Sequence, residues 1–369
     1  MSSEVTPVVS FCIPVYNNAE AAVKIVNSLL SSSDMRFEVV VSDDASTDNA
    51  EDLLSAINDE RFRYCRNEKN LGAHKNWEHS LELGKGEWLY LIMGRDKMNG
   101  ENIGSLINIL DYARENNILY LKDGYTKRSG KEIQVFDGIK AMLEFTRVLH
   151  PTGDIYNGEI FRNIPDRTRY YEISDMYPEN YIKHYLLLRG KGAYVMSGVH
   201  IFENNYSSLV DFSKVKSSVE SKKDISSVYF SPKRRTVQNL ELIDMIDGDE
   251  TFSQDERDLY FSTRFRNITN FVSLLWLGWC SDYLWMAHYG HKIRNVSIRE
   301  MVSNIFTACK DTKTHLQEKG TLTPKRQRII RYCFVKALFR AVVYYPIRAV
   351  AKKILEPLGI WSLLMRGRE

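Results

Sequence analysis

A pair of carboxylates, Asp43 and Asp44, stands directly after the valine-rich run Phe37–Ser42. This run is typical of a buried strand in an open α/β sheet, whose ligands bind beyond the carboxyl ends of the strands. Carboxylate oxygens at that point accept hydrogen bonds from the N–H groups of a base or the hydroxyl groups of a ribose. The pair therefore indicates a site for a polar ligand. Ser46 and Asp48, a little further on, are expected to cap the next helix.

Pro14, Tyr16 and Asn17 follow a second apolar run, Val8–Ile13. The fixed φ of Pro14 is expected to turn the chain outward at the sheet edge, where the ring of Tyr16 can stack on a base. The alternative is an ordinary turn in which Asn17 or Asn18 caps the following helix. Two strand-then-polar units this close in sequence describe a nucleotide-binding half-domain, which favours the ligand contact.

A third polar segment contains Asn70, Gly72 and Lys75. Gly72 lets the backbone approach a ligand closely, and Lys75 at the start of a helix is placed to meet a phosphate. The alternative is that Asn70 only caps the helix and Trp77 packs in the core.

These three segments, in this order and spacing, resemble the motifs of an inverting family 2 glycosyltransferase with the GT-A fold, of the kind that makes bacterial surface polysaccharide or lipopolysaccharide. The resemblance covers about the first 200 residues and fades afterwards. It implies transfer of a sugar from a nucleoside diphosphate sugar, with UDP as the favoured nucleotide, to an acceptor hydroxyl with inversion. It also implies that Asp44, the second carboxylate of its pair, binds the base.

The resemblance further implies an aspartate cluster after the apolar run Trp88–Met93, where a divalent metal would neutralise the departing diphosphate. Here only Asp96 stands at that place, between Arg95 and Lys97. Asp96 is therefore a candidate ligand of Mg or Mn, completed by the diphosphate, waters and a later residue. His200 is a weak candidate for a metal ligand, and a buried structural histidine is the preferred interpretation. In a second interpretation, Arg95 or Lys97 supplies the positive charge directly. In a third, the motif has decayed and the chain is a non-catalytic sugar-nucleotide-binding or assembly subunit.

An inverting transfer also needs a base that takes the proton of the acceptor hydroxyl. The resemblance places an acidic residue just before a helix that leads to a glycine-containing turn. Asp175 fits this context best, Glu179 is the second candidate and Glu172 the third. The alternative roles are a helix cap for Asp175 and a favourable interaction of Glu179 with the helix dipole.

Strand and helix patterns alternate along the first part of the chain, which predicts an α/β fold with a mainly parallel, Rossmann-like sheet. The expected strands are Val8–Ile13, Phe37–Ser42, Phe62–Cys65 and Trp88–Met93, and the expected helices are Ala19–Ser31, Asn49–Ile57, Ala73–Leu83 and Glu101–Asn116. Three regions follow from the composition: a GT-A domain at 1–210, a linker with a helical subdomain at 211–320, and a basic amphipathic helical tail at 321–369.

The 369 residues carry a net charge of +3, and the positive charge is concentrated from Lys325 onward. Because no nucleic-acid-binding motif accompanies these charges, the tail is expected to contact an anionic membrane surface rather than nucleic acid. The sequence shows no signal peptide and no run long and apolar enough to span a membrane. We therefore expect a cytoplasmic protein, peripheral at the inner face of the cell membrane, that acts on a glycan or lipid-linked acceptor.

Overall fold

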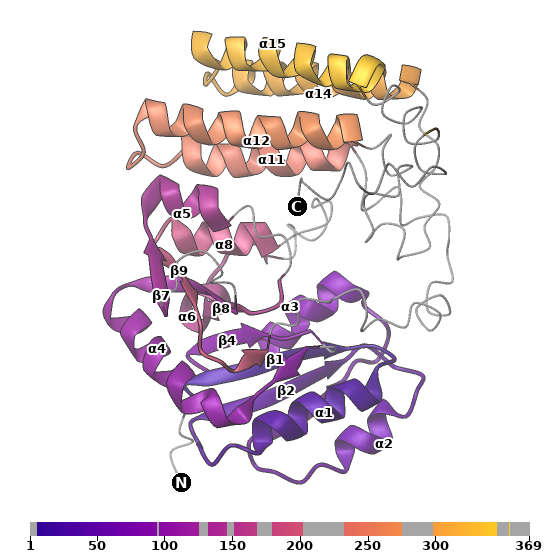
Figure 1. Ribbon diagram of the computed structural model, residues 1–369, viewed down its shortest axis with the longest axis vertical. Coiled ribbons are helices and arrows are strands. Elements are labelled where there is room, and N and C mark those ends of the chain that lie inside the picture. Colours follow the sequence, from indigo (N-terminus) through magenta and orange to yellow (C-terminus); the bar gives the residue numbers. More distant parts are fainter. Residues whose placement is uncertain are drawn as a thin grey trace. The chain divides into compact units, whose positions relative to one another are not determined.

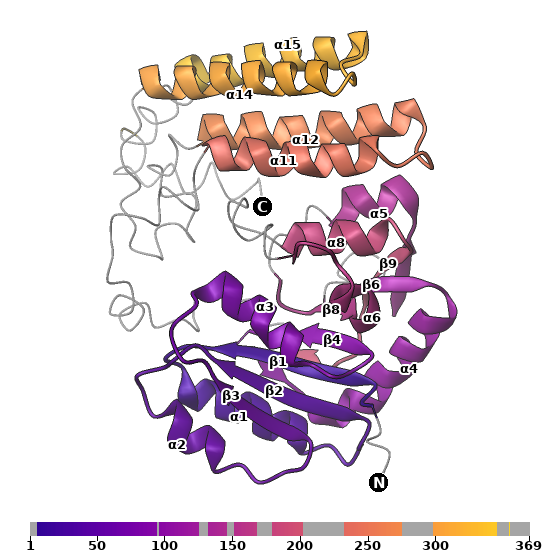
Figure 2. The same ribbon diagram turned by 180° about the vertical axis from the view of Figure 1, so that it is seen from behind.

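A computed structural model describes residues 6–93, 96–124, 132–145, 151–167, 179–201, 232–274, 298–344 and 354. The chain divides into two compact units (Figures 1 and 2). The first comprises Met1–Glu172 with Tyr177–Leu209, and the second comprises Ile173–Met176 with Val210–Glu369. The three regions expected from the sequence remain a prediction. The expected linker at 213–227 lies outside the described residues.

The first unit is built on an eight-stranded sheet with the order β3-β2-β1-β4-β8-β6-β9-β7. Its parallel half consists of β1 (Val9–Val15), β2 (Phe37–Asp43), β3 (Phe62–Arg66) and β4 (Trp88–Leu91). The other half mixes directions, because β8 (Asp154–Asn157) runs antiparallel to both β4 and β6 (Ile118–Asp123), and β7 (Ile133–Phe136) runs antiparallel to β9 (Lys191–Val195). The expected mainly parallel α/β sheet is confirmed.

Helices connect the parallel strands and cover the sheet. The helices α1 (Ala19–Leu30) and α2 (Ala50–Ser55) lie on one face of the parallel half, and α3 (Ala73–Leu83) lies on the other (Figures 1 and 2). Strands buried on both faces need apolar side chains on both, which is why β1 is almost continuously apolar and β2 has the central run Val39–Val41, and both strands are fully buried. Further helices of this unit are α4 (Ile103–Glu115), α5 (Gly138–Phe145), α6 (Gly158–Arg162) and α8 (Glu179–Leu187).

A small two-stranded sheet stands apart from the large one. It pairs β5 (Lys97–Met98) with β10 (His200–Ile201) in antiparallel fashion, and the short 3-10 helix η1 (Gly100–Asn102) follows β5. This pairing brings the segment that follows β4 next to a segment more than a hundred residues later in the chain.

The expectation for Pro14 is wrong, because this residue lies inside β1 and does not turn the chain outward. Pro14 is buried and in register with Ser42 of β2. A proline lacks the N–H that a central strand needs for its second neighbour. The strand β4 pairs with β1 only as far as Cys12, so the missing N–H of Pro14 falls where that neighbour has ended. The chain leaves the sheet at Tyr16 instead.

The second unit is helical in its described part, as expected. It contains α11 (Pro232–Asp247), α12 (Gln254–Leu274), α14 (Ile298–Glu318) and α15 (Pro324–Phe339), and α15 continues into the π-helical turn η3 (Arg340–Tyr344). Thr323 caps α15 by accepting the Arg326 N–H at 3.1 Å, with Pro324 in the first turn. Among the described residues, no helix is long and apolar enough to cross a membrane.

Candidate functional site

The parallel strands end at one edge of the large sheet, and the polar candidates gather there. The N–H of Asp44 donates to the carbonyl of Val15 at 2.8 Å, which joins the tips of β2 and β1. On the other side of β1, Gly153 donates to the carbonyl of Leu91 at the end of β4, and its positive φ of 79° lets it pass close to β6. The edge therefore has the position at which open α/β sheets bind their ligands.

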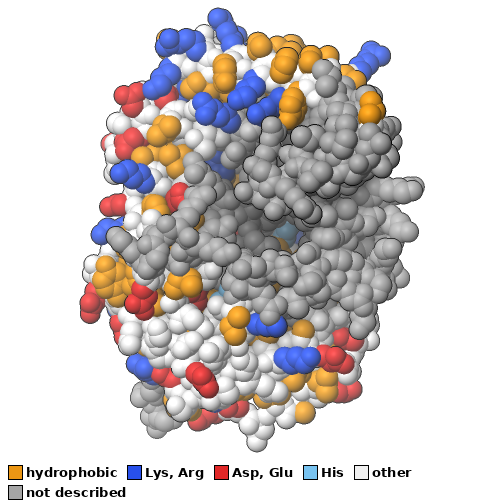
Figure 3. All heavy atoms as spheres, in the orientation of Figure 1, with side chains coloured by type: hydrophobic (Ala, Val, Ile, Leu, Met, Phe, Trp, Pro, Cys, Tyr) orange, Lys and Arg blue, Asp and Glu red, His pale blue; other side chains and the backbone are white. Residues whose placement is uncertain are grey.

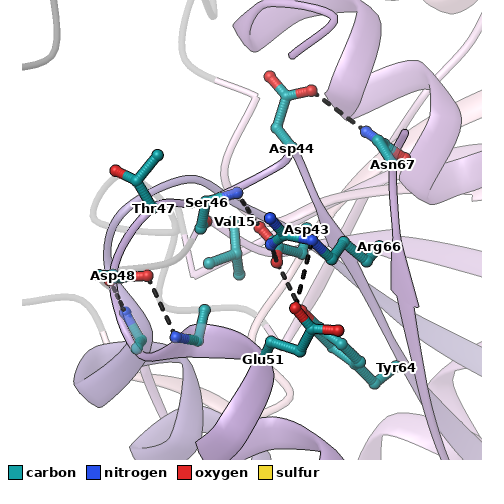
Figure 4. Close-up of polar contacts among 12 residues, drawn as sticks. Val15, Asp43, Asp44, Ser46, Thr47, Asp48, Glu51, Tyr64, Arg66 and Asn67 are labelled. Carbon is teal, nitrogen blue, oxygen red and sulfur yellow. Dashed lines mark hydrogen bonds and ion pairs between the residues drawn. The ribbon is translucent and has the colours of Figure 1, made fainter. Parts of the chain in front are cut away.

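Asp43 has a structural task at this edge. Its buried carboxylate accepts from the Ser46 N–H at 2.9 Å, the Tyr64 hydroxyl at 2.5 Å and the Arg66 guanidinium at 2.8 Å (Figure 4). Burial alone would raise the pKa of Asp43, but the hydrogen bonds from Ser46, Tyr64 and Arg66 outweigh it and hold the pKa below its usual range. Tyr64 and Arg66 belong to β3, so the carboxylate of Asp43 joins the tip of β2 to β3.

Asp44 points away from that cluster and toward Asn67 (Figure 4). One carboxylate oxygen accepts from the Leu71 N–H at 2.6 Å and the Asn67 amide at 3.1 Å, and the other accepts from the Gly72 N–H at 3.0 Å. These donors are neutral, and Asp44 makes no ion pair with any residue the structure describes. Two carboxylate oxygens offer about four acceptor positions. The three donors therefore leave one acceptor position of this buried carboxylate, on the second oxygen, without a donor among the described residues.

The loop after β1 is tied to the loop after β2. Asn17 adopts a left-handed φ of 50°, its Oδ1 accepts from the Thr47 N–H at 2.7 Å, and its own N–H donates to Ser46 Oγ at 3.0 Å. The side-chain oxygen of Asn17 thus forms its hydrogen bond within the protein, whereas the neighbouring ring of Tyr16 is exposed. The exposed ring is compatible with stacking on a base, which stays a prediction.

Capping of the two helices differs in part from the expectation. Asp48 accepts from the Ala50 N–H at 3.2 Å, as expected, and also from the Ala19 N–H at 3.1 Å, so one carboxylate serves the N-termini of both α2 and α1. The expectation for Ser46 is wrong, because its hydroxyl accepts from Asn17 instead of capping α2.

The loop before α3 closes over Asp44. Asn70 donates from its side-chain amide to the Asp44 carbonyl at 3.1 Å and accepts the Gly72 N–H at 3.0 Å. Gly72 has a φ of 85°, a backbone conformation that residues other than glycine rarely adopt. Lys75 is exposed on the first turn of α3, near the positive end of the helix dipole. These three residues are thus brought to the same edge as Asp44.

Asp96 lies beside His200, with 3.7 Å between Asp96 Oδ1 and His200 Nε2, because β5 and β10 pair. Asp96 Oδ2 accepts the Met93 N–H at 2.8 Å. Within the described ranges, no group of three or more His, Cys, Asp and Glu side chains is placed to hold a metal ion. Mg and Mn prefer about six oxygen ligands. One carboxylate and one imidazole do not supply that set, so the described residues would hold such an ion only together with phosphate oxygens of a ligand and waters.

Arg95 and Asp175, two of the predicted site residues, lie outside the described residues, as does Glu172. Glu179, the second candidate for the base, is described and stands at the start of α8. Both of its carboxyl oxygens are buried and make no hydrogen bond within the described part of the chain. Burial raises the pKa of Glu179 to about 8; Lys183 opposes this and Asp154 adds to it. Glu179 therefore keeps its proton at neutral pH.

A buried charged cluster next to Glu179 was not anticipated from the sequence. Asp154 accepts from Lys122 at 2.8 Å and Lys183 at 2.9 Å, and from the hydroxyls of Tyr120 and Tyr156. Lys122 also donates to the Thr152 carbonyl, which fixes the turn before β8. The two lysines hold the pKa of Asp154 low although its burial would raise it. The signal in the sequence is Lys122, which stands directly after the apolar run Ile118–Leu121.

Comparison with known proteins gives the class of this unit. Residues 10–169 match the family model described as "Glycosyl transferase family 2". This segment, which holds β1 to β8, belongs to that family.

Two relatives illustrate the similarity. The chain is 31% identical over 120 residues to the abequosyltransferase RfbV of Salmonella typhimurium, across 31% of this chain and 35% of that protein. It is 28% identical over 122 residues to TuaG of Bacillus subtilis, a putative teichuronic acid biosynthesis glycosyltransferase, across 32% and 47%. The chain thus spans less than half the length of these curated relatives.

Solved structures support the fold over a longer part of the chain. The structure of S. aureus TarS 1–349 in complex with UDP has a TM-score of 0.55 at 15% identity and covers 90% of this chain and 88% of that one. The TarS structure in complex with UDP-GlcNAc has a TM-score of 0.52. The predicted fold class, a GT-A-like α/β domain with a C-terminal helical region, is confirmed.

Proposed function

We propose that this protein is a glycosyltransferase that moves a sugar from a nucleoside diphosphate sugar to an acceptor hydroxyl, with inversion at the anomeric carbon. The observation that carries the proposal is the carboxylate of Asp44, which has an acceptor position left at the ligand edge of a family 2 domain. The TarS complexes with UDP and UDP-GlcNAc support UDP as the nucleotide. The names of RfbV and TuaG support a role in bacterial surface polysaccharide synthesis.

In this proposal the residues along the edge contact different parts of the donor. Asp44 accepts from an N–H of the base, such as N3–H of uracil, in a charge-assisted hydrogen bond. Tyr16 stacks on the base, and the loop that contains Asn70 and Gly72 lies against the nucleoside. Lys75, on the first turn of α3, meets a phosphate. Pro14 is buried within β1, so we no longer assign it a contact with the donor.

The chemical step is a displacement at the anomeric carbon. The acceptor oxygen forms the new glycosidic bond, the bond from carbon to the diphosphate oxygen breaks, and the nucleoside diphosphate leaves with the electron pair. The acceptor proton goes to a carboxylate, for which Asp175 is the first candidate and Glu179 the second. Asp175 is preferred because Glu179, with a pKa near 8, is already protonated at neutral pH.

The departing diphosphate gathers negative charge, which a cation must meet. We propose that Arg95 or Lys97, which flank Asp96, supplies this charge directly. The alternative is a divalent metal that Asp96 would hold together with the diphosphate and waters. A chelator and the variant Arg95→Ala separate this proposal from the metal prediction. We expect Arg95→Ala to abolish turnover while the chelator leaves it intact. Loss of turnover with the chelator, reproduced by Asp96→Ala, would favour the metal.

The acceptor in this proposal is a glycan or a lipid-linked glycan at the inner face of the cell membrane. The relatives named for abequose transfer and teichuronic acid synthesis support an acceptor of this class. A non-catalytic sugar-nucleotide-binding or assembly subunit is the second candidate, because Asp96 is the one carboxylate of the expected cluster.

Release of UDP from a panel of UDP sugars tests the proposal. An active transferase is expected to hydrolyse its own donor slowly in the absence of acceptor and to release UDP faster with acceptor present. Donor binding with no UDP release under either condition would favour the non-catalytic subunit.

A further inference from the structure

Helix α15 buries one face in the second unit. Ile330, Cys333, Ala337 and Ala341 recur every three or four residues and are buried. Arg326 on the same face is fully buried and forms ion pairs with Asp247 of α11 at 2.6 Å and with Asp258 of α12 at 2.8 Å. This half of the helix is firmly packed, so its opposite side is a fixed surface and not a loose tail.

The opposite side of α15 is also apolar. Tyr332, Val335 and Phe339 follow the helical repeat, and their exposed fractions are 57%, 65% and 57%. The neighbouring helix α14 adds Phe306, which is 58% exposed and whose ring centroid lies 6.4 Å from that of Phe334. Soluble surfaces rarely gather so many large apolar side chains in one place. We call the following exposed residues the α14–α15 apolar face: Phe306, Tyr332, Val335, Phe339, Val342 and Val343.

Basic side chains border this face, and α15 and η3 contain no acidic residue. Arg328, Arg331 and Lys336 are exposed and make no ion pair with any residue the structure describes. Lys336 Nζ lies 5.6 Å from the ring centroid of Tyr332. On α14, Lys310 is exposed one helical turn from Phe306. Figure 3 shows basic and hydrophobic side chains together over α14 and α15 at the top of the view.

We propose that the α14–α15 apolar face binds to an anionic lipid surface. Its large side chains would enter the boundary between headgroups and acyl chains, while Arg328, Arg331 and Lys336 reach the headgroup phosphates. The charge decides against a second copy of this chain as the occupant. Two such faces pressed together would bring arginines and lysines against one another without acidic residues of α15 to balance them.

This inference deepens the proposed function. It rests on that proposal in one respect, namely that the acceptor is linked to a membrane. It also changes the earlier expectation of a membrane-binding tail from Lys325 onward. Arg326 is buried and paired with Asp247, and Lys325 pairs with Asp255 at 2.7 Å, so neither charge faces a lipid surface unpaired. The surface that remains is built by two helices, with residues 345–353 and 355–369 outside the described part.

Sedimentation of the full chain with phosphatidylcholine vesicles, with and without phosphatidylglycerol, tests the inference. We expect binding that requires phosphatidylglycerol and weakens with salt. Arg331→Glu is expected to reduce partitioning roughly fivefold or more, since one basic side chain near such a surface contributes about 1 kcal/mol. Phe339→Ser is expected to reduce it by a similar or larger factor.

Matched controls change exposed residues elsewhere. Leu259→Ser on α12, where the leucine is 50% exposed, and Lys140→Glu on α5 are expected to bind vesicles like the wild type. Circular dichroism melts check that each variant is folded, and Val335→Ser replaces Phe339→Ser if the latter unfolds. The inference is overturned if wild type and face variants sediment equally. It is also overturned if the wild type ignores vesicles and instead forms an oligomer that Phe339→Ser dissociates.

UDP binding by calorimetry on the same preparations keeps the two proposals apart. The face variants should retain wild-type affinity for UDP, because all predicted donor residues lie in the first unit. Vesicle binding without UDP binding would refute the donor site and leave the membrane face standing. UDP binding without vesicle binding would refute the membrane face and leave the donor site standing.

Discussion

At the tip of β2, Asp43 is enclosed by Ser46, Tyr64 and the cation of Arg66, whereas Asp44 receives neutral donors and keeps an unused acceptor position. Two identical side chains, one residue apart, therefore have different chemistry. Because Asp44 also anchors Leu71 and Gly72, removing its carboxylate affects the loop as well as the ligand.

Asp44→Asn should raise the dissociation constant for UDP about tenfold or more, because a charge-assisted hydrogen bond to the base is lost. Isothermal titration calorimetry measures this dissociation constant. Asp48→Asn is the matched control: it weakens the caps of α1 and α2 and lowers the melting temperature, but should leave UDP affinity near normal. Equal UDP affinity of Asp44→Asn and wild type would contradict the assignment of Asp44.

Glu179 should make stability depend on pH. Its folded pKa of about 8 lies above its ordinary value of 4.5, so the folded chain holds a proton that the unfolded chain has lost between these values. Stability should therefore fall as pH rises from about 4.5 to about 8, by on the order of a few kcal/mol from this residue. Glu179→Gln should remove that part of the slope in urea unfolding series. A slope identical in both proteins would show that Glu179 titrates normally.

Turnover should separate the two candidate bases. Asp175→Asn is expected to lower turnover on the order of a hundredfold or more with donor binding preserved, because the acceptor proton loses its destination. Glu179→Gln should cost less at neutral pH, since this carboxyl is already protonated there. If Glu179→Gln is the inactive variant and Asp175→Asn is near normal, the roles are reversed.

Among the elements, those with a strong pattern were predictable and those fixed by distant partners were not. The runs that became β1 and β2 are apolar because helices cover both faces, and this leaves a clear trace in the sequence. The short strands β8 and β10 are held by β4 and β5, far away in the chain, and their own residues alternate too briefly to reveal them. The position of Asp44 at the sheet edge was predictable because its motif is local, whereas the cluster around Asp154 comes from three separate elements.

The helices of the second unit should depend strongly on Arg326. Arg326→Met would leave Asp247 and Asp258 as buried charges without their partner, which typically costs about 3–5 kcal/mol. Urea unfolding of the second unit should show this loss. The control Arg328→Met changes an exposed arginine two residues further along the chain and should change stability by about 0.5 kcal/mol or less. Similar stability of the two variants would mean that the buried ion pairs contribute little.

At the scale of the whole molecule, the described donor residues belong to the first unit and the apolar face belongs to the second. The proposed donor site and the proposed membrane-binding face therefore lie in different units. A change in either unit is therefore expected to affect one property and spare the other, as the paired UDP and vesicle measurements above would show.

The most direct test of the central claim is release of UDP from UDP sugars by the wild type and by Asp44→Asn, at donor concentrations below saturation. We expect the wild type to release UDP from at least one UDP sugar, faster with a glycan acceptor, and Asp44→Asn to release it about tenfold or more slowly. Equal rates for both proteins, or no release with any UDP sugar, would contradict the central claim.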